Sequence, residues 1–331
     1  MGTLSPLTWG DSNCKMQNSK LQSKAFIDIG TNSVLLLIID QNKNILADEA
    51  AITRLGEGLA QKSEFIPQAM DRTFAALEKY VKLCQQHQID EIVAVGTAGF
   101  RKAKNSKHFV EQIKKSLGIS VEIISGEKEA ELTWKAASAD FGENIVVIDV
   151  GGGSTEIITN LSLRGMPATK QSISLPIGSV LLTEKFCHSD PISDVDYQNL
   201  CKVIDEALPQ FPSPPVGEGQ GEGVLVATAG TATTLAAIDL GLKEYKHSKV
   251  HGYKLSVERL KLILAELKSK TIEERKNIPG LQPGRADVIL AGALILEKFS
   301  KQLRAETIII SDRGVRWGLA MNFVCAKNKL Q

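Results

Sequence analysis

The spacing of apolar residues changes along the first third of the chain. Residues 25–40 (AFIDIGTNSVLLLIID) predict two strands around a tight turn, and residues 45–53 predict a third strand of an antiparallel meander. After Pro67, apolar residues recur at gaps of four and three, which places them on one face of a helix. The residues of this face are Met70, Phe74, Leu77, Val81 and Cys84. The pattern therefore predicts a helix packed on a sheet.

Strands and helices then alternate along the rest of the chain. Strands are expected at residues 92–95, 121–124, 145–150, 156–161, 172–175, 224–227 and 307–311. Helices are expected up to residue 117 with Asn105 or Ser106 as the cap, from Gly126 onward, and at residues 195–208, 257–267, 285–303 and 313–326. A meander followed by alternating strands and helices indicates an α/β fold.

Two segments fall outside this alternation. Residues 1–23 are polar and lack the apolar core of a signal peptide, so we expect a disordered leader. Residues 212–223 (PSPPVGEGQGEG) are rich in glycine, but no Lys-Ser or Lys-Thr follows them, and Glu218 and Glu222 would repel phosphate. This second segment is predicted to be a flexible surface loop.

Two hairpin turns carry the same sequence pattern, I-D-x-G-x-x-S. Aligned on their aspartates, the turns match at three positions with equal intervals. The matched pairs are Asp28 with Asp149, Gly30 with Gly151, and Ser33 with Ser154. Such a tight turn exposes successive backbone N–H groups and forms an anion-binding nest. Two nests in one chain suggest two similar halves that face one phosphate-bearing ligand.

An ordinary hairpin with an Asx-type cap explains either turn alone, but both together favour phosphate binding. The glycines let the backbone approach a ligand, and the hydroxyl groups add donors. On this interpretation the phosphate-binding residues are Gly30, Thr31, Asn32, Ser33, Gly151, Gly152, Gly153, Ser154 and Thr155. Asp28 and Asp149 would repel phosphate directly, so we expect them to hold Mg²⁺ or its water ligands.

The helix that begins near Gly126 carries three glutamates in its first turns. Acids at this place ordinarily favour the helix dipole, which explains most such clusters. Glu127 and Glu131 are one turn apart and share a face, whereas Glu129 points roughly the opposite way. If one of the three faces the interior, we expect it to be Glu129.

For the other candidate residues, the sequence does not decide between a binding role and a structural role. Arg101 follows a predicted strand and belongs either to a solvated basic turn or to a guanidinium fork that binds phosphate oxygens. Gly230 and Thr231 begin a helix that either binds an anion through free N–H groups or is simply a capped core helix. Three arginines of the last third either line an anion path or pair with acids. They are Arg285, Arg313 and Arg316.

Composition narrows the class of protein. With 331 residues, 43% of them hydrophobic and 23% charged, the chain is expected to form about two globular domains. The formal net charge of +1 provides no global attraction for DNA or an anionic membrane, and no apolar run approaches the roughly 20 residues of a spanning helix. Five scattered cysteines without a C-x-x-C spacing argue against a disulfide framework or a zinc site and suggest the cytoplasm. No H-E-x-x-H, G-x-S-x-G or Walker A motif is present.

Taken in order, these motifs resemble the exopolyphosphatase and guanosine pentaphosphate phosphatase (Ppx/GppA) family of the actin-like superfamily. The resemblance covers residues 25–320 and rests on AFIDIGTNS, GTAGFRKAKN, ISGEKEAE, IDVGGGSTE, SLPIGSV, AGTATTLAA and SDRGVRWGLA. It implies two ribonuclease-H-like domains with the active site in the cleft between them. Domain I would comprise residues 24–131 plus 312–331, and domain II residues 132–311.

The resemblance also implies roles for individual residues. Glu129 matches the glutamate that activates water, and Arg101 matches an arginine that contacts phosphate. Asp149 and Glu156 match acids that bind Mg²⁺ or position the nucleophile, which makes Glu156 a candidate for both catalysis and metal binding. The implied reaction is Mg²⁺-dependent hydrolysis of the terminal phosphoanhydride of inorganic polyphosphate or guanosine pentaphosphate, and a homodimer is expected.

The sequence departs from the family pattern at three points. Glu131 stands where many relatives have arginine, GTAGFR replaces the more usual T-S-A-x-R, and the chain stops where larger relatives continue into a helical domain. The first and third departures leave undecided how firmly the protein binds long polyphosphate chains. Three alternative functions also remain, namely a non-catalytic nucleotide or polyphosphate sensor, a nucleoside triphosphatase and an ATP-dependent kinase.

Overall fold

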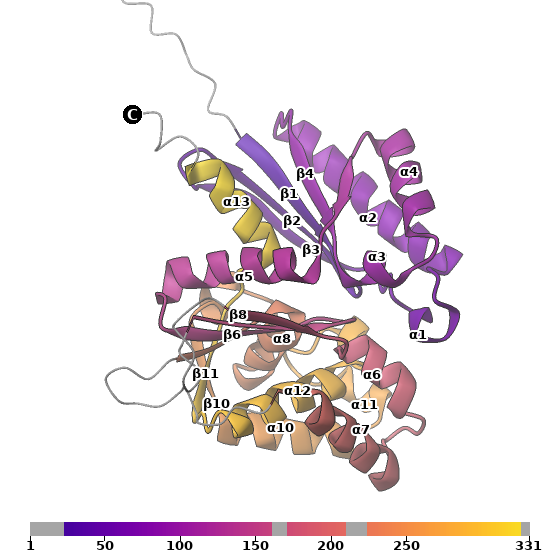
Figure 1. The fold of residues 1–331 in the computed structure, drawn as a ribbon, viewed down its shortest axis with the longest axis vertical. Coiled ribbons are helices and arrows are strands. Elements are labelled where there is room, and N and C mark those ends of the chain that lie inside the picture. Colours follow the sequence, from indigo (N-terminus) through magenta and orange to yellow (C-terminus); the bar gives the residue numbers. More distant parts are fainter. Residues whose placement is uncertain (1–22, 161–170, 210–223, 326–331) are drawn as a thin grey trace, which may run out of the picture.

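The computed structural model describes residues 23–160, 171–209 and 224–325, which form two β-sheets covered by helices (Figure 1). The strand order is β3-β2-β1-β4-β5 in the first sheet and β10-β11-β9-β6-β7-β8 in the second. Both sheets combine parallel and antiparallel pairs, as in the pairing of β1 with β4 and with β2. The architecture is the α/β class that the alternation of elements predicts.

The first sheet is built from the N-terminal meander. Its strands are β1 (Ser23–Ile29), β2 (Ser33–Asp40), β3 (Ile45–Ile52), β4 (Ile92–Gly96) and β5 (Val121–Ile123). Four helices accompany them, namely α1 (Leu59–Lys62), α2 (Pro67–Gln86), α3 (Ala98–Lys102) and α4 (Ser106–Leu117). Ile27, Leu36 and Ile38 pack with Leu77 of α2 in one core cluster, while Leu37 belongs to another on the opposite face. The interior strand β2 is almost wholly apolar because both faces of the sheet are covered.

The second sheet is built from the middle of the chain. Its strands are β6 (Ile145–Val150), β7 (Thr155–Thr159), β8 (Gln171–Leu175), β9 (Val224–Thr228), β10 (Tyr253–Ser256) and β11 (Thr307–Ile310). Its helices are α6 (Ser179–Phe186), α7 (Asp194–Ala207), α8 (Ala229–Asp239), α9 (His247–Val250), α10 (Val257–Ser269), α11 (Ile272–Arg275) and α12 (Ile289–Gln302). Residues of α12 are buried around most of its circumference, as its mostly apolar sequence predicts.

Helices α5 (Gly126–Phe141) and α13 (Val315–Cys325) lie between the two sheets (Figure 1). Ala136 of α5 packs with Phe26 and Trp317 on the side of the first sheet, whereas Trp134 packs with Val147 of the second. The last helix thus returns to the first sheet, as the resemblance implies. The predicted domain boundary between residues 131 and 132 falls inside α5, so the exact division of the chain stays a prediction.

Most of the predicted elements are confirmed, and the differences have local causes. The helix expected from Arg285 begins at Ile289, because Pro283–Arg285 form a separate 3₁₀ turn. Asn105 precedes α4, but its side chain binds the backbone of Phe65 instead of capping the helix. Helix α6 and strand β10 were not predicted, and four more helices have only four or five residues, too few to show a period. The leader, apart from Ser23, and the loop at 212–223 lie outside the described residues.

None of the helices in the described ranges combines the length and apolar character needed to cross a membrane.

Candidate active site

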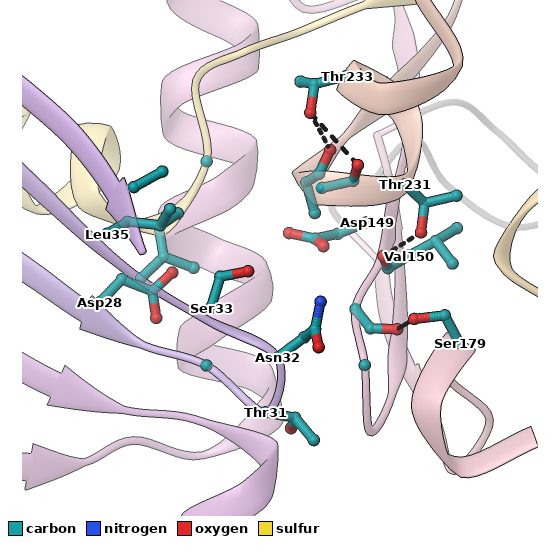
Figure 2. A pocket seen from close by; sticks show the side chains of 18 of the residues that line it. Asp28, Thr31, Asn32, Ser33, Leu35, Asp149, Val150, Ser179, Thr231 and Thr233 are labelled. Carbon is teal, nitrogen blue, oxygen red and sulfur yellow. Dashed lines mark hydrogen bonds between the residues drawn. The ribbon is translucent and has the colours of Figure 1, made fainter. Parts of the chain in front are cut away.

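The two turns with the shared pattern face each other across a cavity of about 310 Å³ (Figure 2). In both, the glycine N–H donates to the serine carbonyl, over 2.9 Å from Gly30 to Ser33 and over 3.0 Å from Gly151 to Ser154. The repeated sequence therefore forms a repeated structure. The cavity is lined by both turns, from Gly30 to Ser33 and from Gly151 to Ser154.

The side chain of Thr31 forms the contact between the two turns. A Cβ atom added at Gly153 would lie 2.9 Å from Thr31 Oγ1, and one at Gly152 would lie 3.1 Å from Thr31 Cβ. Thr31 also packs against Gly56 and Gly99 of the first half. A side chain at Gly56 or Gly153 would collide with the side chain of Thr31, so glycine lets Thr31 fit between the turns.

Two aspartates stand at equivalent places beside the turns, and both line the cavity. Across its hairpin, Asp28 of β1 is paired with Leu35, whereas Asp149 of β6 is paired with Glu156. Burial, together with the smaller effect of the Glu129 carboxylate, raises the pKa of both aspartates to about 7. Thr133 donates a hydrogen bond of 3.3 Å to Asp149, whereas Oδ1 of Asp28 is buried without a hydrogen-bond partner.

Glu129 enters the same cavity from the first turns of α5. Ser125 caps this helix by accepting a hydrogen bond of 3.2 Å from Lys128 N, which fixes the direction of the first turn. Glu129 is 8% exposed, while Glu127 and Glu131 are exposed, so the expectation that Glu129 is the inward glutamate is confirmed. Burial raises the pKa of Glu129, and the charge of Arg101 opposes that shift.

Arg101 turns toward acids in this structure. Its Nη1 donates over 2.7 Å to Oε2 of Glu129 and over 3.0 Å to the carbonyl of Ile124, and its Nη2 lies 4.0 Å from Oε1 of Glu156. Arg101 does not line the cavity, so its contact with phosphate stays a prediction.

Two other predicted residues lie in the wall behind the cavity lining. Thr155 is fully buried and donates over 2.8 Å to the carbonyl of Ile177. Glu156 is 1% exposed and accepts a hydrogen bond of 2.8 Å from Ser174, while its Oε2 is buried without a hydrogen-bond partner. Burial raises the pKa of Glu156 well above its ordinary value, and Glu129 and Asp149 raise it further. Glu156 thus lies close to the lining acids Glu129 and Asp149 but outside the lining itself.

The start of α8 forms another part of the lining. Gly230 and Thr231 both face the cavity, and the Thr231 hydroxyl donates over 3.2 Å to the carbonyl of Val150 (Figure 2). The backbone of Gly230 lies directly against the guanidinium of Arg285, which a side chain at this position would displace.

Arg285 is the cavity residue that the sequence left undecided. It donates over 2.9 Å to Ser33 Oγ of the first turn and over 3.3 Å to Gln282, and it has no acidic partner among the described residues. Burial lowers its pKa to about 10, which leaves it charged near neutrality. The other two arginines of the last third pair with acids, Arg313 with Asp140 and Arg316 with Asp48. Only the contacts made in the fold distinguish Arg285 from the other two arginines.

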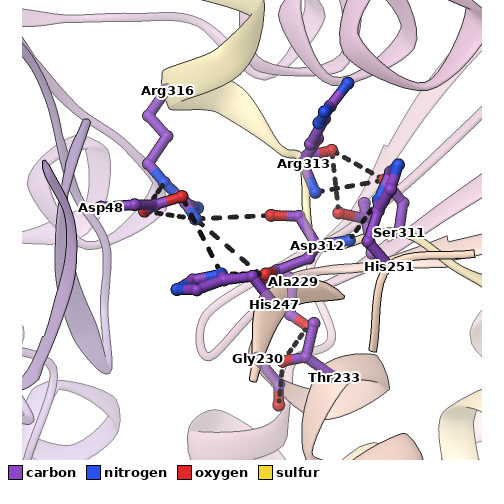
Figure 3. A network of polar contacts seen from close by, with 11 residues as sticks. Asp48, Ala229, Gly230, Thr233, His247, His251, Ser311, Asp312, Arg313 and Arg316 are labelled. Atoms are coloured by element: carbon purple, nitrogen blue, oxygen red, sulfur yellow. Dashed lines mark hydrogen bonds and ion pairs between the residues drawn. The ribbon is translucent and has the colours of Figure 1, made fainter. Parts of the chain in front are cut away.

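A polar network closes the far end of the cavity, where β3 approaches α9 (Figure 3). Arg316 donates over 3.0 Å to Oδ1 of Asp48, and Oδ1 of Asp312 lies 4.0 Å from the Arg316 guanidinium. His247 Nδ1 bonds to Asp312 and lies 3.9 Å from Asp48, so the network joins the two halves. The hydrogen bond with Asp312 raises the pKa of His247. No sequence motif marked His247, because it approaches Asp48 only in the fold.

The donor set fits a magnesium ion. Among the described residues, no three His, Cys, Asp or Glu side chains are grouped closely enough to hold a metal ion by themselves. Mg²⁺, however, usually binds one or two carboxylates and completes its shell with water and phosphate oxygens. Asp28 and Asp149 offer two such carboxylates in one cavity, and one buried oxygen of Asp28 has no other partner.

Comparison with known proteins assigns the chain to a family. Residues 35–325 match the model of the Ppx/GppA phosphatase family. The chain is 31% identical over 318 residues to exopolyphosphatase 2 of Mycobacterium tuberculosis, an alignment that covers 90% of this chain and 97% of the relative. It is also 32% identical over 309 residues to the bifunctional 3-dehydroquinate synthase/phosphatase of Fusobacterium nucleatum, covering 87% of this chain and 45% of that protein.

Solved structures agree with this assignment. The crystal structure of the Ppx/GppA family member of Aquifex aeolicus superimposes with a TM-score of 0.74 at 31% identity, covering 93% of this chain and 99% of that one. An exopolyphosphatase from Cytophaga hutchinsonii gives a TM-score of 0.80 at 27% identity, covering 92% and 98%. These matches confirm the predicted fold of two actin-like domains.

Proposed function

Because the chain belongs to the Ppx/GppA phosphatase family, we propose that it hydrolyses the terminal phosphoanhydride of inorganic polyphosphate or guanosine pentaphosphate. The observation that carries the proposal is the place of Glu129, whose carboxylate enters the cavity between the two turns and beside two aspartates. The relatives named exopolyphosphatase support this class of substrate. Water would attack the terminal phosphorus in line with the leaving oxygen.

The two turns would hold the phosphoryl oxygens of the substrate. Each turn is closed by the hydrogen bond from its first glycine N–H to the serine carbonyl, so the remaining N–H groups of the turn need little rearrangement to bind phosphate. Donors that are fixed in advance stabilise developing charge better than donors that must reorganise. Arg285 would add a charged donor at the Ser33 side of the cavity.

Asp28 and Asp149 would hold Mg²⁺, with Glu156 as a further carboxylate in the wall behind them. When bound, the ion would neutralise charge on the phosphate oxygens and help align the transferred group. Burial and the nearby Glu129 carboxylate raise the pKa of both aspartates, and a bound cation would favour their ionised forms.

Glu129 would act as the general base. Its Oε2 accepts the hydrogen bond from Arg101, which leaves Oε1 to accept a proton from the attacking water. Burial makes the carboxylate more basic, while Arg101 keeps it from becoming protonated too readily. The balance between these two effects would place the pKa between that of an exposed glutamate and that of an unpaired buried one.

Phosphate release from three substrates tests the proposal. Purified protein with Mg²⁺ is expected to release orthophosphate from inorganic polyphosphate or guanosine pentaphosphate with a higher kcat/KM than from ATP. Tight binding without release from any substrate would favour the non-catalytic sensor, which needs the turns but not Glu129. A requirement for an acceptor hydroxyl would favour a kinase.

A homodimer and a cytoplasmic location remain part of the proposal. Light scattering after gel filtration would measure the mass of the assembly in solution. The free thiols of Cys84, Cys187 and Cys201 accord with a reducing compartment.

A further inference from the structure

A second cavity, of about 370 Å³, lies behind the tips of the two turns. Its walls come from the turns themselves and from helices α1 and α6. It shares Thr31, Gly152 and Gly153 with the active-site cavity, so these three residues have one cavity on each side. A thin wall therefore separates the place of phosphate cleavage from a second, separate space.

The wall between the cavities is one side chain thick at Thr31. This side chain fits against Gly152 and Gly153, which have no side chains to thicken the wall. Joining the two spaces therefore requires movement of the Thr31 side chain. The wall is thus formed by the same turns that are proposed to hold the transferred phosphoryl group.

The second cavity is lined by two lysines and several apolar residues. Lys102 of α3 and Lys185 of α6 both line it, together with apolar residues such as Leu59, Pro176 and Val180. Nζ of Lys102 donates to the carbonyl of Gly153, at the tip of the second turn. Burial lowers the pKa of Lys102, and the charges of Arg101 and Lys185 lower it further. A bound anion would relieve this repulsion between cations.

One carboxylate in the lining restricts which anion fits. Oε1 of Glu184 accepts a hydrogen bond of 2.7 Å from the N–H of Gly58, whereas Oε2 is buried without a hydrogen-bond partner. An anion that also carries a hydroxyl group could donate to this oxygen while its other oxygens face the two lysines. Orthophosphate near neutral pH has such a P–OH group, but an internal phosphate of a polyphosphate chain does not. The lining therefore favours orthophosphate over the interior of a chain.

We propose that this second cavity binds the orthophosphate released in the active site and provides its exit past Thr31, while the remaining substrate stays on the Arg285 side. The inference rests on the proposed hydrolase function. It explains why a basic cavity adjoins the turns at the face opposite Asp28, Asp149 and Glu129, none of which lines it. Product and shortened substrate would then leave by different routes.

Binding of orthophosphate tests the cavity without any need for turnover. Titration calorimetry with inorganic phosphate is expected to show about tenfold weaker binding to Lys185→Ala than to the wild type, the loss of one charge-assisted hydrogen bond. Lys62→Ala is the matched control, because Lys62 ends the neighbouring helix α1 and does not line the cavity. Equal phosphate affinity of Lys185→Ala and wild type would overturn the site.

Release kinetics test the exit. Ala60→Trp should fill the cavity, and Gln61→Trp, at an exposed position of the same helix, is its control. With the preferred substrate, rapid quenching is expected to show an unchanged first turnover in Ala60→Trp, whereas a fluorescent phosphate-binding reporter should show free phosphate appearing severalfold later. Simultaneous appearance, as in the wild type, would overturn the exit.

The two tests fail in different ways from the proposed function. If the wild type releases no phosphate from any substrate, the proposed function is wrong, and the calorimetric comparison still decides whether the second cavity binds orthophosphate. Circular dichroism of each variant checks folding. If Ala60→Trp does not fold, Leu181→Phe fills the same cavity from α6 and replaces it in the release measurement.

Discussion

Nη1 of Arg101 donates a hydrogen bond of 2.7 Å to Oε2 of Glu129, and this pair joins the first half of the molecule to the helix between the sheets. The contact holds Oε2 of Glu129 in place, whereas Oε1 takes no part in it. Burial raises the pKa of Glu129 and the Arg101 guanidinium lowers it, so the protonation of the proposed base depends on this pair.

Glu129→Gln should lower kcat by about a hundredfold or more, the usual contribution of a positioned general base, while substrate binding is retained. Initial rates of phosphate release and equilibrium binding of the substrate measure the two effects. Glu131→Gln is the matched control, because Glu131 lies two residues further along the same helix, is exposed and pairs with Lys128. Near wild-type kcat in Glu129→Gln would remove the residue from this role.

Arg101→Gln should shift the acidic limb of the pH profile of kcat/KM to higher pH. Arg101 lowers the pKa of Glu129, so its removal raises that pKa, and the base becomes protonated at a pH where the wild-type base is still ionised. Arg101→Lys keeps the positive charge and should restore much of the original profile. An unmoved acidic limb in Arg101→Gln would show that another group titrates there.

The pKa of Asp28 predicts how Mg²⁺ and pH together affect the stability of the fold. Its pKa is raised from 3.8 to about 7, so the folded protein binds more protons than the unfolded chain between these values. The contribution of Asp28 is therefore fully present below about pH 4 and is lost as pH rises through about 7.

Without metal, Asp28→Asn should consequently melt above the wild type at pH 8, and the difference should shrink at pH 5. Mg²⁺ should raise the melting temperature of the wild type more at pH 8 than at pH 5, because protons compete for the same oxygens. Differential scanning fluorimetry with and without Mg²⁺ measures both effects. An equal Mg²⁺ effect in wild type and Asp28→Asn would contradict the metal assignment.

Arg316→Met should destabilise the fold by about 3 kcal/mol, because it leaves the Asp48 carboxylate, whose side chain is only 10% exposed, without its guanidinium partner. Arg316 is 5% exposed and lies between Asp48 and Asp312, so solvent cannot replace it easily. Arg259→Met is the control, since the Arg259 side chain is 52% exposed in its pair with Asp239 and should contribute at most about 1 kcal/mol. Urea unfolding followed by circular dichroism gives both values, and equal losses would show that burial does not govern the network.

The sequence predicted the turns and Glu129 because local pattern determines both. I-D-x-G-x-x-S specifies a strand, a tight turn and a second strand within a few residues, and the helical period alone separates Glu129 from Glu127 and Glu131. The sequence could not separate Arg285 from Arg316, since both follow turns near predicted helices. Their difference arises from what the other half of the molecule places beside them, Ser33 in one case and Asp48 in the other.

The second cavity and the network around His247 could not be predicted either, because both are formed by residues far apart in the sequence. Lys102 reads as part of a solvated basic turn until the fold places it against Gly153, 51 residues away. His247 and Asp312 are 65 residues apart and meet only because α9 lies beside the loop that follows β11. No periodicity or spacing in the sequence records such contacts.

The unequal partners of the two aspartates give the cavity a direction. Leu35 stands opposite Asp28 and Glu156 opposite Asp149, so one half of a duplicated scaffold carries an acid where the other carries an apolar side chain. Two carboxyl groups therefore lie beside the second turn, whereas one lies beside the first. The difference at a single position of the repeat makes two nearly symmetric nests unequal, so in the proposed reaction the phosphoryl group that is cleaved meets different side chains from the one that is retained.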